Sequence, residues 1–343
     1  MNRIVTTKIK IDPNNFSRDE VDLAVRLLRL GEVVVLPTET VYGLAANATD
    51  SHAVEKIFEI KRRPASNPII VHVSSTTMAK ECAAIWDVRA ELLARRFWPG
   101  PLTLVVPKSA LIPDIVTAGG STVGIRCPAQ LFTRSVIESL DAPIAAPSAN
   151  PFSYISPTTA EHVIKNLDGL VPLIVDAGAC EVGIESTVLD LTGEMPTVLR
   201  PGLITPEQIG QVLGGAIRLK PASGGSKQGE LLKSPGQFKK HYSPRARVVL
   251  CPTEKFREFD TILKDLNFRG KLIGIVTFSG IKDIVGASYI VNLSDQPEKF
   301  AKQIYSAFHD FDMAGVELIV VEEPPDSADW LAVRDRLFRA AAI

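Results

Sequence analysis

The sequence lacks paired cysteines, a long apolar run and a signal-peptide core. Its four cysteines (Cys82, Cys127, Cys180 and Cys251) lie far apart and form no C-x-x-C pair. This spacing counts against a zinc site and a disulfide framework, and it fits a reducing compartment. No apolar stretch approaches the ~18 residues of a membrane helix, and no apolar core follows Met1. We therefore expect a cytoplasmic protein.

An excess of charge of one sign is also missing. The 38 Lys and Arg nearly balance the 39 Asp and Glu, which gives a net charge of −1. No global field therefore favours nucleic acid or membrane, and any such affinity must be local. The content of 45% apolar and 22% charged residues is that of a globular protein. Because a chain of 343 residues is longer than a typical single domain, two domains are expected.

The common nucleotide and hydrolase motifs are missing too. The sequence contains no G-x-x-x-x-G-K-[ST], no G-x-G-x-x-G after an apolar run, no G-x-S-x-G and no H-E-x-x-H. If this chain binds phosphates, side chains must make most of the phosphate contacts that the backbone of a glycine-rich loop makes in other proteins.

What the sequence does have is a basic triplet, Lys61-Arg62-Arg63, followed by Pro64 and Pro68. The prolines forbid a helix through this segment, so the triplet is expected where a helix ends. Two interpretations stay open for it. The cations could form a solvated helix C-terminus that suits the helix dipole, or they could bind a polyanion.

Alternating apolar patterns predict an α/β fold. Ser17 and Glu20 form a capping box before a helix that Gly31 ends. The run 33–36 is typical of a strand buried on both faces, and further strands are expected at 69–73, 102–106, 122–126, 173–176, 186–191 and 197–200. Helices are expected at 50–61, from Pro157 onward and at 205–213. Short strand-to-strand joins favour a mixed, twisted sheet.

Gly, Ser, Pro, Lys and Gln dominate residues 221–244, which predicts a basic linker, either solvated or laid over an anion as a lid. Beyond it, strands are expected at 248–250, 271–278, 289–293 and 318–321, and helices at 254–266, 297–312 and 330–341. The expected domains are therefore 1–220, a linker at 221–244 and a smaller α/β domain at 245–343.

Polar residues near strand ends are the candidates for chemistry, because ligands of open α/β sheets bind at the carboxyl ends of strands. They are Thr38, Thr40, Lys61, Arg63, Asn67, His72, Arg126, Ser148, Asn150, Ser156, Ser186 and Arg200. Several cations facing one cleft would need an anionic ligand. Each residue also has a structural interpretation. His72 could be a packed core residue, Ser148 and Asn150 a turn, and Arg200 an exposed turn residue.

Six motifs resemble the YrdC/Sua5 family and occur in its order. They are Pro37-Thr38-Glu39-Thr40-Val41-Tyr42-Gly43-Leu44, Lys61-x-Arg63-Pro64, Gly124-Ile125-Arg126-x-Pro128, Pro147-Ser148-Ala149-Asn150, Glu185-Ser186-Thr187-Val188 and Leu199-Arg200-Pro201-Gly202. Ser234-Pro235-Gly236 and His241-Tyr242-Ser243-Pro244 resemble the linker of the long, Sua5-type members. The chain departs from the family at Ser243, where alanine is common, and at 332–335, where an asparagine-containing pattern is expected.

The resemblance implies a YrdC-like mixed twisted sheet, a linker and a smaller Rossmann-like domain. It also implies L-threonylcarbamoyladenylate synthase activity, in which L-threonine, bicarbonate and ATP give threonylcarbamoyl-AMP and pyrophosphate. The product serves N6-threonylcarbamoylation of adenosine 37 in tRNA through a tRNA threonylcarbamoyltransferase. Mg²⁺ is expected to bind together with ATP, and no metal site formed by protein side chains alone is expected.

The site residues implied by the resemblance fall into two groups. Lys61 and Arg63 are expected to be catalytic, and the ATP-binding set is Lys61, Arg63, Asn67, Ser148, Asn150, Ser156, Arg200 and Tyr242, with Tyr242 closing over the nucleotide. The threonine-binding set is Thr38, Thr40, Tyr42, His72, Arg126 and Ser186, with Arg126 facing the carboxylate. The chemistry agrees, because in-line attack on a phosphate needs neutralised charge and excluded water more than a nucleophile. No general base stands out.

Three other functions compete. A non-catalytic module could bind RNA weakly through the basic cleft, with salt-dependent affinity. A carbamoyltransferase of the hydrogenase-maturation type shares this domain, but such proteins are much larger and contain zinc fingers. The second domain could also make the chain a regulatory protein that senses a ligand.

Overall fold

The computed structural model describes residues 4–220, 233–236, 241–258, 271–280, 284 and 286–342. The chain divides into two compact units. The first comprises Met1–Phe152 and Ser156–Gln237, and the second comprises Ser153–Ile155 and Phe238–Ile343. Within the described ranges, no helix is long and apolar enough to cross a membrane. Most of the expected linker at 221–244 lies outside the described residues.

A mixed sheet forms the centre of the first unit, as predicted. In the described part of the chain its order is β1-β8-β2-β3-β7-β4-β6-β5-β9-β10-β11. The sheet combines parallel pairs such as β1–β8, β2–β8 and β4–β6 with antiparallel pairs such as β2–β3, β5–β6 and β9–β10. The strands are Thr7–Lys10 (β1), Val34–Leu36 (β2), Gly43–Asn47 (β3), Val71–His72 (β4), Leu102–Pro107 (β5), Thr122–Arg126 (β6), Ile144–Ala145 (β7), Leu173–Asp176 (β8), Thr187–Asp190 (β9), Thr197–Arg200 (β10) and Arg218–Leu219 (β11).

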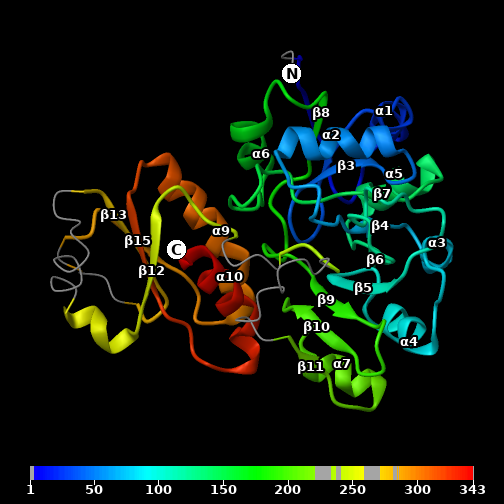
Figure 1. Ribbon diagram of the computed structural model, residues 1–343. Helices are drawn as coiled ribbons and strands as arrows, with labels where there is room; N and C mark the ends of the chain where they lie inside the picture. Colours follow the sequence, from blue (N-terminus) through cyan, green and yellow to red (C-terminus); the bar gives the residue numbers. More distant parts are fainter. Residues whose placement is uncertain are drawn as a thin grey trace. The chain divides into compact units, whose positions relative to one another are not determined.

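Helices cover this sheet on both faces (Figure 1). They are Arg18–Arg29 (α1), Ser51–Lys61 (α2), Thr76–Cys82 (α3), Val88–Phe97 (α4), Leu131–Leu140 (α5), Ala160–Leu167 (α6) and Pro206–Leu213 (α7). The capping box of Ser17 and Glu20 at the start of α1 is confirmed. Asp50 caps α2 by accepting from the backbone N–H groups of His52 and Ala53.

Strand β2 shows why this sheet is buried on both faces. Val33 and Val35 pack into the apolar cluster that contains Ile57 of α2. Val34 and Leu36 pack into a second cluster, which contains residues of α1 and α5. Because successive side chains of a strand point to opposite faces, the continuous apolar run fills both layers. The strand ends where the functional segment Thr38–Tyr42 begins.

Several elements differ from the sequence prediction, which gave no strands at β1, β7 and β11 and no helix at α5, and two further strands of the sheet show why. Strand β4 is only two residues long, although the apolar run predicts five, and the N–H of Ile69 instead bonds to the carbonyl of Val116 outside the sheet. Strand β3 was not predicted at all. It forms because Gly43 pairs with Leu36 of β2 while Ala46 pairs with Ala145 of β7. Strand pairing of this kind depends on distant partners that local pattern does not reveal.

The second unit contains a smaller parallel sheet in the order β12-β15-β13-β14 among the residues described. Its strands are Arg247–Cys251 (β12), Ile273–Thr277 (β13), Tyr289–Asn292 (β14) and Leu318–Glu322 (β15). Helices Pro297–Met313 (α9) and Leu331–Ala341 (α10) lie beside this sheet (Figure 1). Of the helix expected at 254–266, Thr253–Glu258 forms a 3₁₀ helix and residues 259–270 lie outside the described part.

A fully buried carboxylate marks the carboxyl ends of these strands. Glu322 ends β15, and its Oε2 accepts hydrogen bonds from the Thr277 hydroxyl at 2.6 Å and from the N–H groups of Phe278 and Ser279 at 2.8 and 3.0 Å. Its Oε1 accepts from the Thr253 hydroxyl at 2.8 Å. Burial alone raises the pKa of Glu322, but these hydrogen bonds outweigh it and hold the pKa below its usual value.

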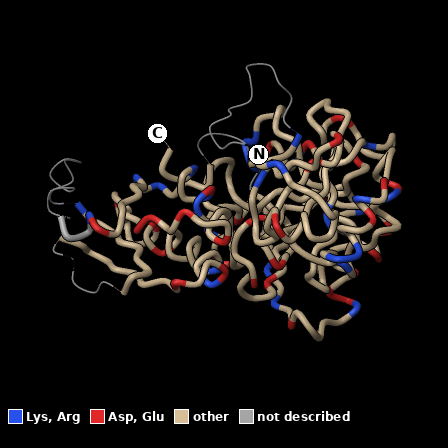
Figure 2. Tube along the Cα trace, turned by 90° about the horizontal axis from the view of Figure 1, so that it is seen from below, with Lys and Arg blue, Asp and Glu red and all other residues tan. Residues whose placement is uncertain are grey.

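Lys and Arg alternate with Asp and Glu along the trace of each unit (Figure 2). This mixture agrees with the net charge of −1. Any anion site must therefore come from a local gathering of cations.

We predict that Glu322→Gln lowers the free energy of unfolding of the second unit by about 1.5–3 kcal/mol at pH 7, because hydrogen bonds to a charged acceptor are lost. The difference from wild type should shrink in acid. The ionised form stabilises the fold above the unfolded pKa of about 4.3, and this contribution disappears as pH falls through the depressed native pKa. Hydrogen exchange of the β13 and β15 amides at increasing urea concentration measures the free energy of unfolding of the second unit at each pH.

Glu323→Gln is the matched control, because the adjacent Glu323 lies at the surface with a 3.5 Å ion pair to Arg334. Its effect should stay within about 1 kcal/mol. Equal losses in the two variants would contradict the special role of Glu322.

Candidate active site

The basic triplet is split by the backbone between the interior and solvent. Lys61 is the last residue of α2 and is 1% exposed, and Arg63 is also buried. Arg62 between them is exposed and has the left-handed conformation, with φ 50°. This single αL residue ends the helix and turns two of the three cations inward. The interpretation as a solvated helix end is therefore wrong for Lys61 and Arg63.

The Lys61 ammonium bonds to backbone carbonyls. Its Nζ donates to the Ser148 oxygen at 2.5 Å and to the Asn150 oxygen. Burial, and then the neighbouring Arg63, lower the pKa of Lys61 well below its usual value. Lys61 has no carboxylate partner in the described chain. An ammonium has three N–H donors, so one is left for a ligand.

Arg63 closes the loop that follows the triplet. Its guanidinium donates to the carbonyls of Asn67 at 3.1 Å and Pro68 at 2.7 Å, and it lies 5.9 Å from the centre of the Phe152 ring. The Asn67 side chain is fully buried, yet neither atom of its amide has a hydrogen-bond partner in the part of the chain described. Because buried amides are normally bonded, this amide is a candidate for ligand recognition.

The segment after β2 is held by its own hydroxyls. Thr38 Oγ1 donates to the carbonyl of Val41 at 2.6 Å and lies 2.9 Å from Thr40 Oγ1. The carbonyls of Glu39 and Thr40 accept from the N–H groups of Val182 and Gly183. This loop therefore joins the 180–186 segment to the end of β2.

Arg126 ends β6 and reaches this loop. Its Nη1 donates to Thr40 Oγ1 at 2.8 Å, and its Nε donates to the Gly100 carbonyl at 3.2 Å. Its Nη2 lies 2.6 Å from Glu39 Oε1 in a buried ion pair, but the two groups are not aligned as a hydrogen bond. Arg126 is thus anchored on one side, while Nη2 has no hydrogen bond among the described residues.

His72 stands beside Arg126 because β4 and β6 are parallel, with these two residues in register. Its Nδ1 is buried without a hydrogen-bond partner among the described residues. Burial, and then the Arg126 charge, lower the pKa of His72 to about 3. The imidazole is therefore neutral at physiological pH and can donate or accept a hydrogen bond but carries no charge.

A third group joins Ser186 and Arg200. The Ser186 hydroxyl lies 2.7 Å from Thr103 Oγ1, and Arg200 donates to the hydroxyl and to the carbonyl of Ser186, each at 3.1 Å. Gly202 permits this turn, since a Cβ there would lie 2.3 Å from the Thr187 nitrogen. Nearby, Ser156 donates to Glu185 Oε1 at 2.6 Å.

Comparisons with known proteins decide the family. Residues 26–202 match the Sua5/YciO/YrdC family model, described as "Telomere recombination". Residues 204–342 match "Threonylcarbamoyl-AMP synthase, C-terminal domain". The chain belongs to the Sua5/YciO/YrdC family.

Relatives in this family match almost the whole chain. The threonylcarbamoyl-AMP synthase of Pyrococcus abyssi is 41% identical over 325 residues, which cover 94% of each chain. That of Bacillus subtilis is 40% identical over 325 residues, which cover 94% of this chain and 93% of the relative. The crystal structure of P. abyssi Sua5 complexed with L-threonine has a TM-score of 0.90 and 38% identity, and the match covers 98% of both chains.

Two tyrosines expected in the site have other contacts in this Sua5/YciO/YrdC chain. The Tyr42 hydroxyl donates to the Gly178 carbonyl at 2.7 Å and accepts from the Ala177 N–H at 3.1 Å. Tyr42 therefore supports the loop after β2 through its hydroxyl. Tyr242 belongs to the second unit, where its ring lies 5.0 Å from the Arg336 guanidinium. Its closure over the nucleotide stays a prediction.

Sequence reasoning gave no role to Glu39 and Thr103, which the structure places among the predicted site residues. Thr103 is the polar residue in an apolar strand, and it is fully buried. Glu39 lies within the first quoted motif, flanked by threonines. The available signals were a hydroxyl residue within an apolar strand and an acid between two threonines near the end of a strand. Neither signal by itself indicates an anion site, which is predicted from cations.

No group of three or more His, Cys, Asp and Glu side chains that could hold a metal ion occurs in the described ranges. This donor set does not make a cage for a divalent cation. Mg²⁺ typically binds through substrate phosphates, water and one or two carboxylates.

We predict that His72 does not titrate between pH 5 and pH 8 in the folded protein, because its pKa of about 3 lies far below this range. The ¹⁵N chemical shifts of labelled histidines measure this directly. The unfolded protein in urea is the control, since all 5 imidazoles are then solvated. A transition of His72 near pH 6.5 in the folded protein would contradict this prediction, because that value is typical of a solvated imidazole.

Proposed function

We propose that this chain is a threonylcarbamoyl-AMP synthase that condenses L-threonine, bicarbonate and ATP to threonylcarbamoyl-AMP and pyrophosphate. The curated relatives from P. abyssi and B. subtilis carry this name and match along nearly the whole chain. A solved relative of the same length binds L-threonine. The proposal covers both units, because both family models match.

One observation of the structure carries the proposal. The first unit buries Lys61, Arg126 and Arg200, and it also buries polar atoms of Asn67 and His72 that have no hydrogen-bond partner among the described residues. Buried charges and buried unpartnered amides are costly, so folded proteins retain them where a ligand completes them. Several cations suit a triphosphate, and a small amino acid matches the hydroxyl and imidazole groups beside Arg126.

We assign the nucleotide to the side that holds Lys61 and Arg63. The ATP-binding residues in this proposal are Lys61, Arg63, Asn67, Ser148, Asn150, Ser156, Arg200 and Tyr242. Lys61 and Arg63 would neutralise the charge that develops at the phosphates during the transfer, which is the catalytic role expected of them. Mg²⁺ enters with ATP as part of the substrate.

The amino acid is assigned to the side that holds Arg126. Arg126 would pair with the threonine carboxylate through Nη2, and the other residues assigned to threonine are Thr38, Thr40, Tyr42, His72 and Ser186. The neutral imidazole of His72 adds a hydrogen bond without adding charge. Placing a carbamate oxygen and the α-phosphate side by side supplies most of the rate acceleration, and the buried setting protects the unstable carbamate from water.

The product sets the next partner. A mixed anhydride of a carbamate and AMP is an activated acyl donor, so we propose that a tRNA threonylcarbamoyltransferase accepts it. A cytoplasmic location is part of the same proposal. It is supported by the four free, buried cysteines and by the use of ATP.

Pyrophosphate release tests the function. The protein with ATP, Mg²⁺, bicarbonate and L-threonine should release pyrophosphate, and omission of threonine or bicarbonate should abolish the release. A coupled phosphate assay measures the rate, and mass spectrometry identifies threonylcarbamoyl-AMP. Release that does not depend on threonine would refute the proposal.

Arginine variants test the nucleotide side. Arg63→Ala and Arg200→Ala should each weaken ATP binding by about 10- to 100-fold, because hydrogen bonds to a charged ligand contribute about 1.5–3 kcal/mol. Arg62→Ala removes the same charge from the exposed neighbour and should bind ATP as the wild type does. Isothermal titration with a non-hydrolysable ATP analogue gives the three constants. Wild-type affinity in both buried variants would contradict the assignment.

A further inference from the structure

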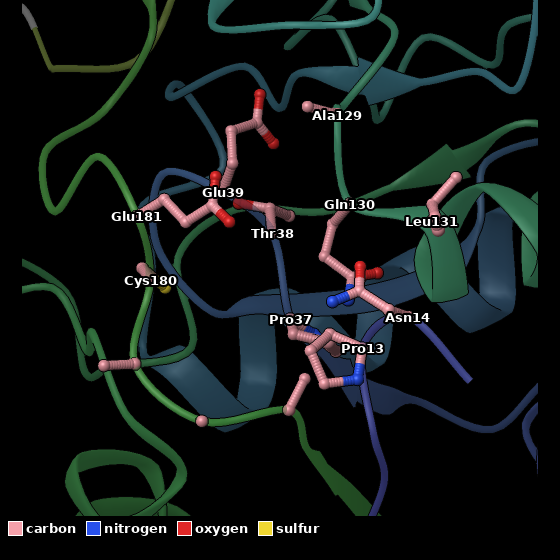
Figure 3. Close-up of a pocket in the computed structure, with 13 residues that line it drawn as sticks. Pro13, Asn14, Pro37, Thr38, Glu39, Ala129, Gln130, Leu131, Cys180 and Glu181 are labelled. Carbon is pink, nitrogen blue, oxygen red and sulfur yellow. The ribbon is translucent and has the colours of Figure 1, made fainter. Parts of the chain in front are cut away.

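Glu39 lies in the loop after β2 between two threonines whose hydroxyls are bonded, and its backbone carbonyl is fixed by the Val182 N–H at 2.7 Å. The side chain is 5% exposed and lines a pocket in the first unit. Figure 3 labels Asn14, Gln130 and Glu39 among the residues that line this pocket. Both carboxylate oxygens of Glu39 are buried, so the side chain is held at the wall of the pocket.

The carboxylate of Glu39 has no hydrogen-bond donor. Neither Oε1 nor Oε2 is hydrogen-bonded to any part of the chain that the structure describes. The 2.6 Å ion pair with Arg126 offsets the charge of the carboxylate but does not supply a hydrogen bond to either of its oxygens. A buried carboxylate in this state is costly, so the natural occupant of the neighbouring space is a cationic donor.

From this arrangement we infer that Glu39 receives the ammonium group of the amino-acid substrate and removes one proton from it. The inference rests on the proposed synthase function and deepens it. In an α-amino acid one carbon separates the ammonium from the carboxylate. A substrate whose carboxylate pairs with Arg126 therefore presents its ammonium within a few ångströms of Glu39, which is 2.6 Å from the same guanidinium.

The step balances without an outside reagent. Threonine has an ammonium group at neutral pH, and only the free amine attacks bicarbonate. Proton transfer to Glu39 gives the amine and a neutral carboxyl group. The amine and bicarbonate then give the carbamate and one water molecule, and the proton leaves to solvent after the adenylate has formed.

Binding of the substrate makes Glu39 a stronger base. In the free protein, Glu39 Oε1 lies 2.6 Å from Arg126 Nη2. When the substrate carboxylate also pairs with Arg126, two anions share one cation, and their repulsion raises the proton affinity of Glu39. The base therefore becomes effective only when the amino acid is in place.

The other titratable groups around Glu39 do not compete for this proton. Arg126 stays charged, and burial raises the pKa of Cys180 far above neutrality and that of Cys127 to about 11. Both thiols are therefore neutral at pH 7. Glu181 lines the same pocket, but its side chain is exposed to solvent.

Glu39→Gln keeps the shape but cannot accept the proton. At pH 7 its kcat for threonine-dependent pyrophosphate release should fall at least about 100-fold, while the KM for ATP changes little. The decisive readout is the pH profile. In the variant, kcat should rise about tenfold per pH unit toward alkaline pH, because only threonine that has already lost its proton reacts. A structural defect would lower the rate equally at every pH.

Glu181→Gln is the matched control, since it removes a carboxylate from the exposed rim of the pocket and should leave the rate and the profile unchanged. A second measurement needs only the wild type. 2,3-Dihydroxybutanoate, which has a hydroxyl in place of the amine, should bind at least about 10-fold more weakly than threonine. Equal affinity would overturn the inference even if Glu39→Gln does not fold.

The two proposals fail in different ways. If the wild type releases no threonine-dependent pyrophosphate, the synthase function and the role of Glu39 both fail. If the wild type is active and Glu39→Gln matches it in rate at every pH, the role of Glu39 alone is wrong.

Discussion

Buried positive charge is the constraint on which the first unit depends. Lys61, Arg126 and Arg200 are all nearly inaccessible to water, and Glu39 is the carboxylate that pairs with one of them in the described chain. Backbone carbonyls and hydroxyls satisfy the remaining donors only in part. Burial, and then the neighbouring Arg63, lower the pKa of Lys61. The fold therefore retains a favourable potential for anions in a chain of almost zero net charge.

The sheet topology is what brings these charges together. Arg126 and His72 are neighbours because β4 and β6 run parallel in register, although the two strands lie far apart in the sequence. Arg200 reaches Ser186 because β10 folds back antiparallel to β9. The antiparallel partners β3 and β7 bring Gly43 beside Ser148. Each contact crosses between strands, so the site exists only when the whole sheet has formed.

Local pattern predicted much of this molecule. The cap at Ser17, the strand after Gly31 and the helix ending at Lys61 follow from capping chemistry and apolar periodicity, and the structure confirms them. The mixed sheet also follows from the short joins. The extent of β4 and the existence of β3 did not follow, because both depend on which distant segment pairs with them.

The candidate site was predicted in composition but not in arrangement. Motifs indicated the cations, yet nothing in the sequence shows that Arg62 adopts φ 50° and so turns Lys61 and Arg63 inward. The proposed role of Glu39 depends on a carboxylate whose oxygens accept no hydrogen bond from the described residues. The sequence cannot show this, because it depends on the positions of all the neighbouring donors. Sequence gives the chemical types, whereas the backbone conformation at one residue and the register of several strands give their geometry.

Glu322 gives the second unit a different relation to its surroundings. Parallel sheets usually bind ligands where their strands end, and here an internal carboxylate already holds the hydroxyls and N–H groups at that edge. The carboxylate of Glu322 therefore fills, as a covalent part of the chain, the place at this edge where a bound anion could sit. Of the buried cations Lys61, Arg126 and Arg200 of the first unit, only Arg126 has such an internal anion, Glu39, among the described residues, so a bound anionic ligand should raise the thermal stability of that unit.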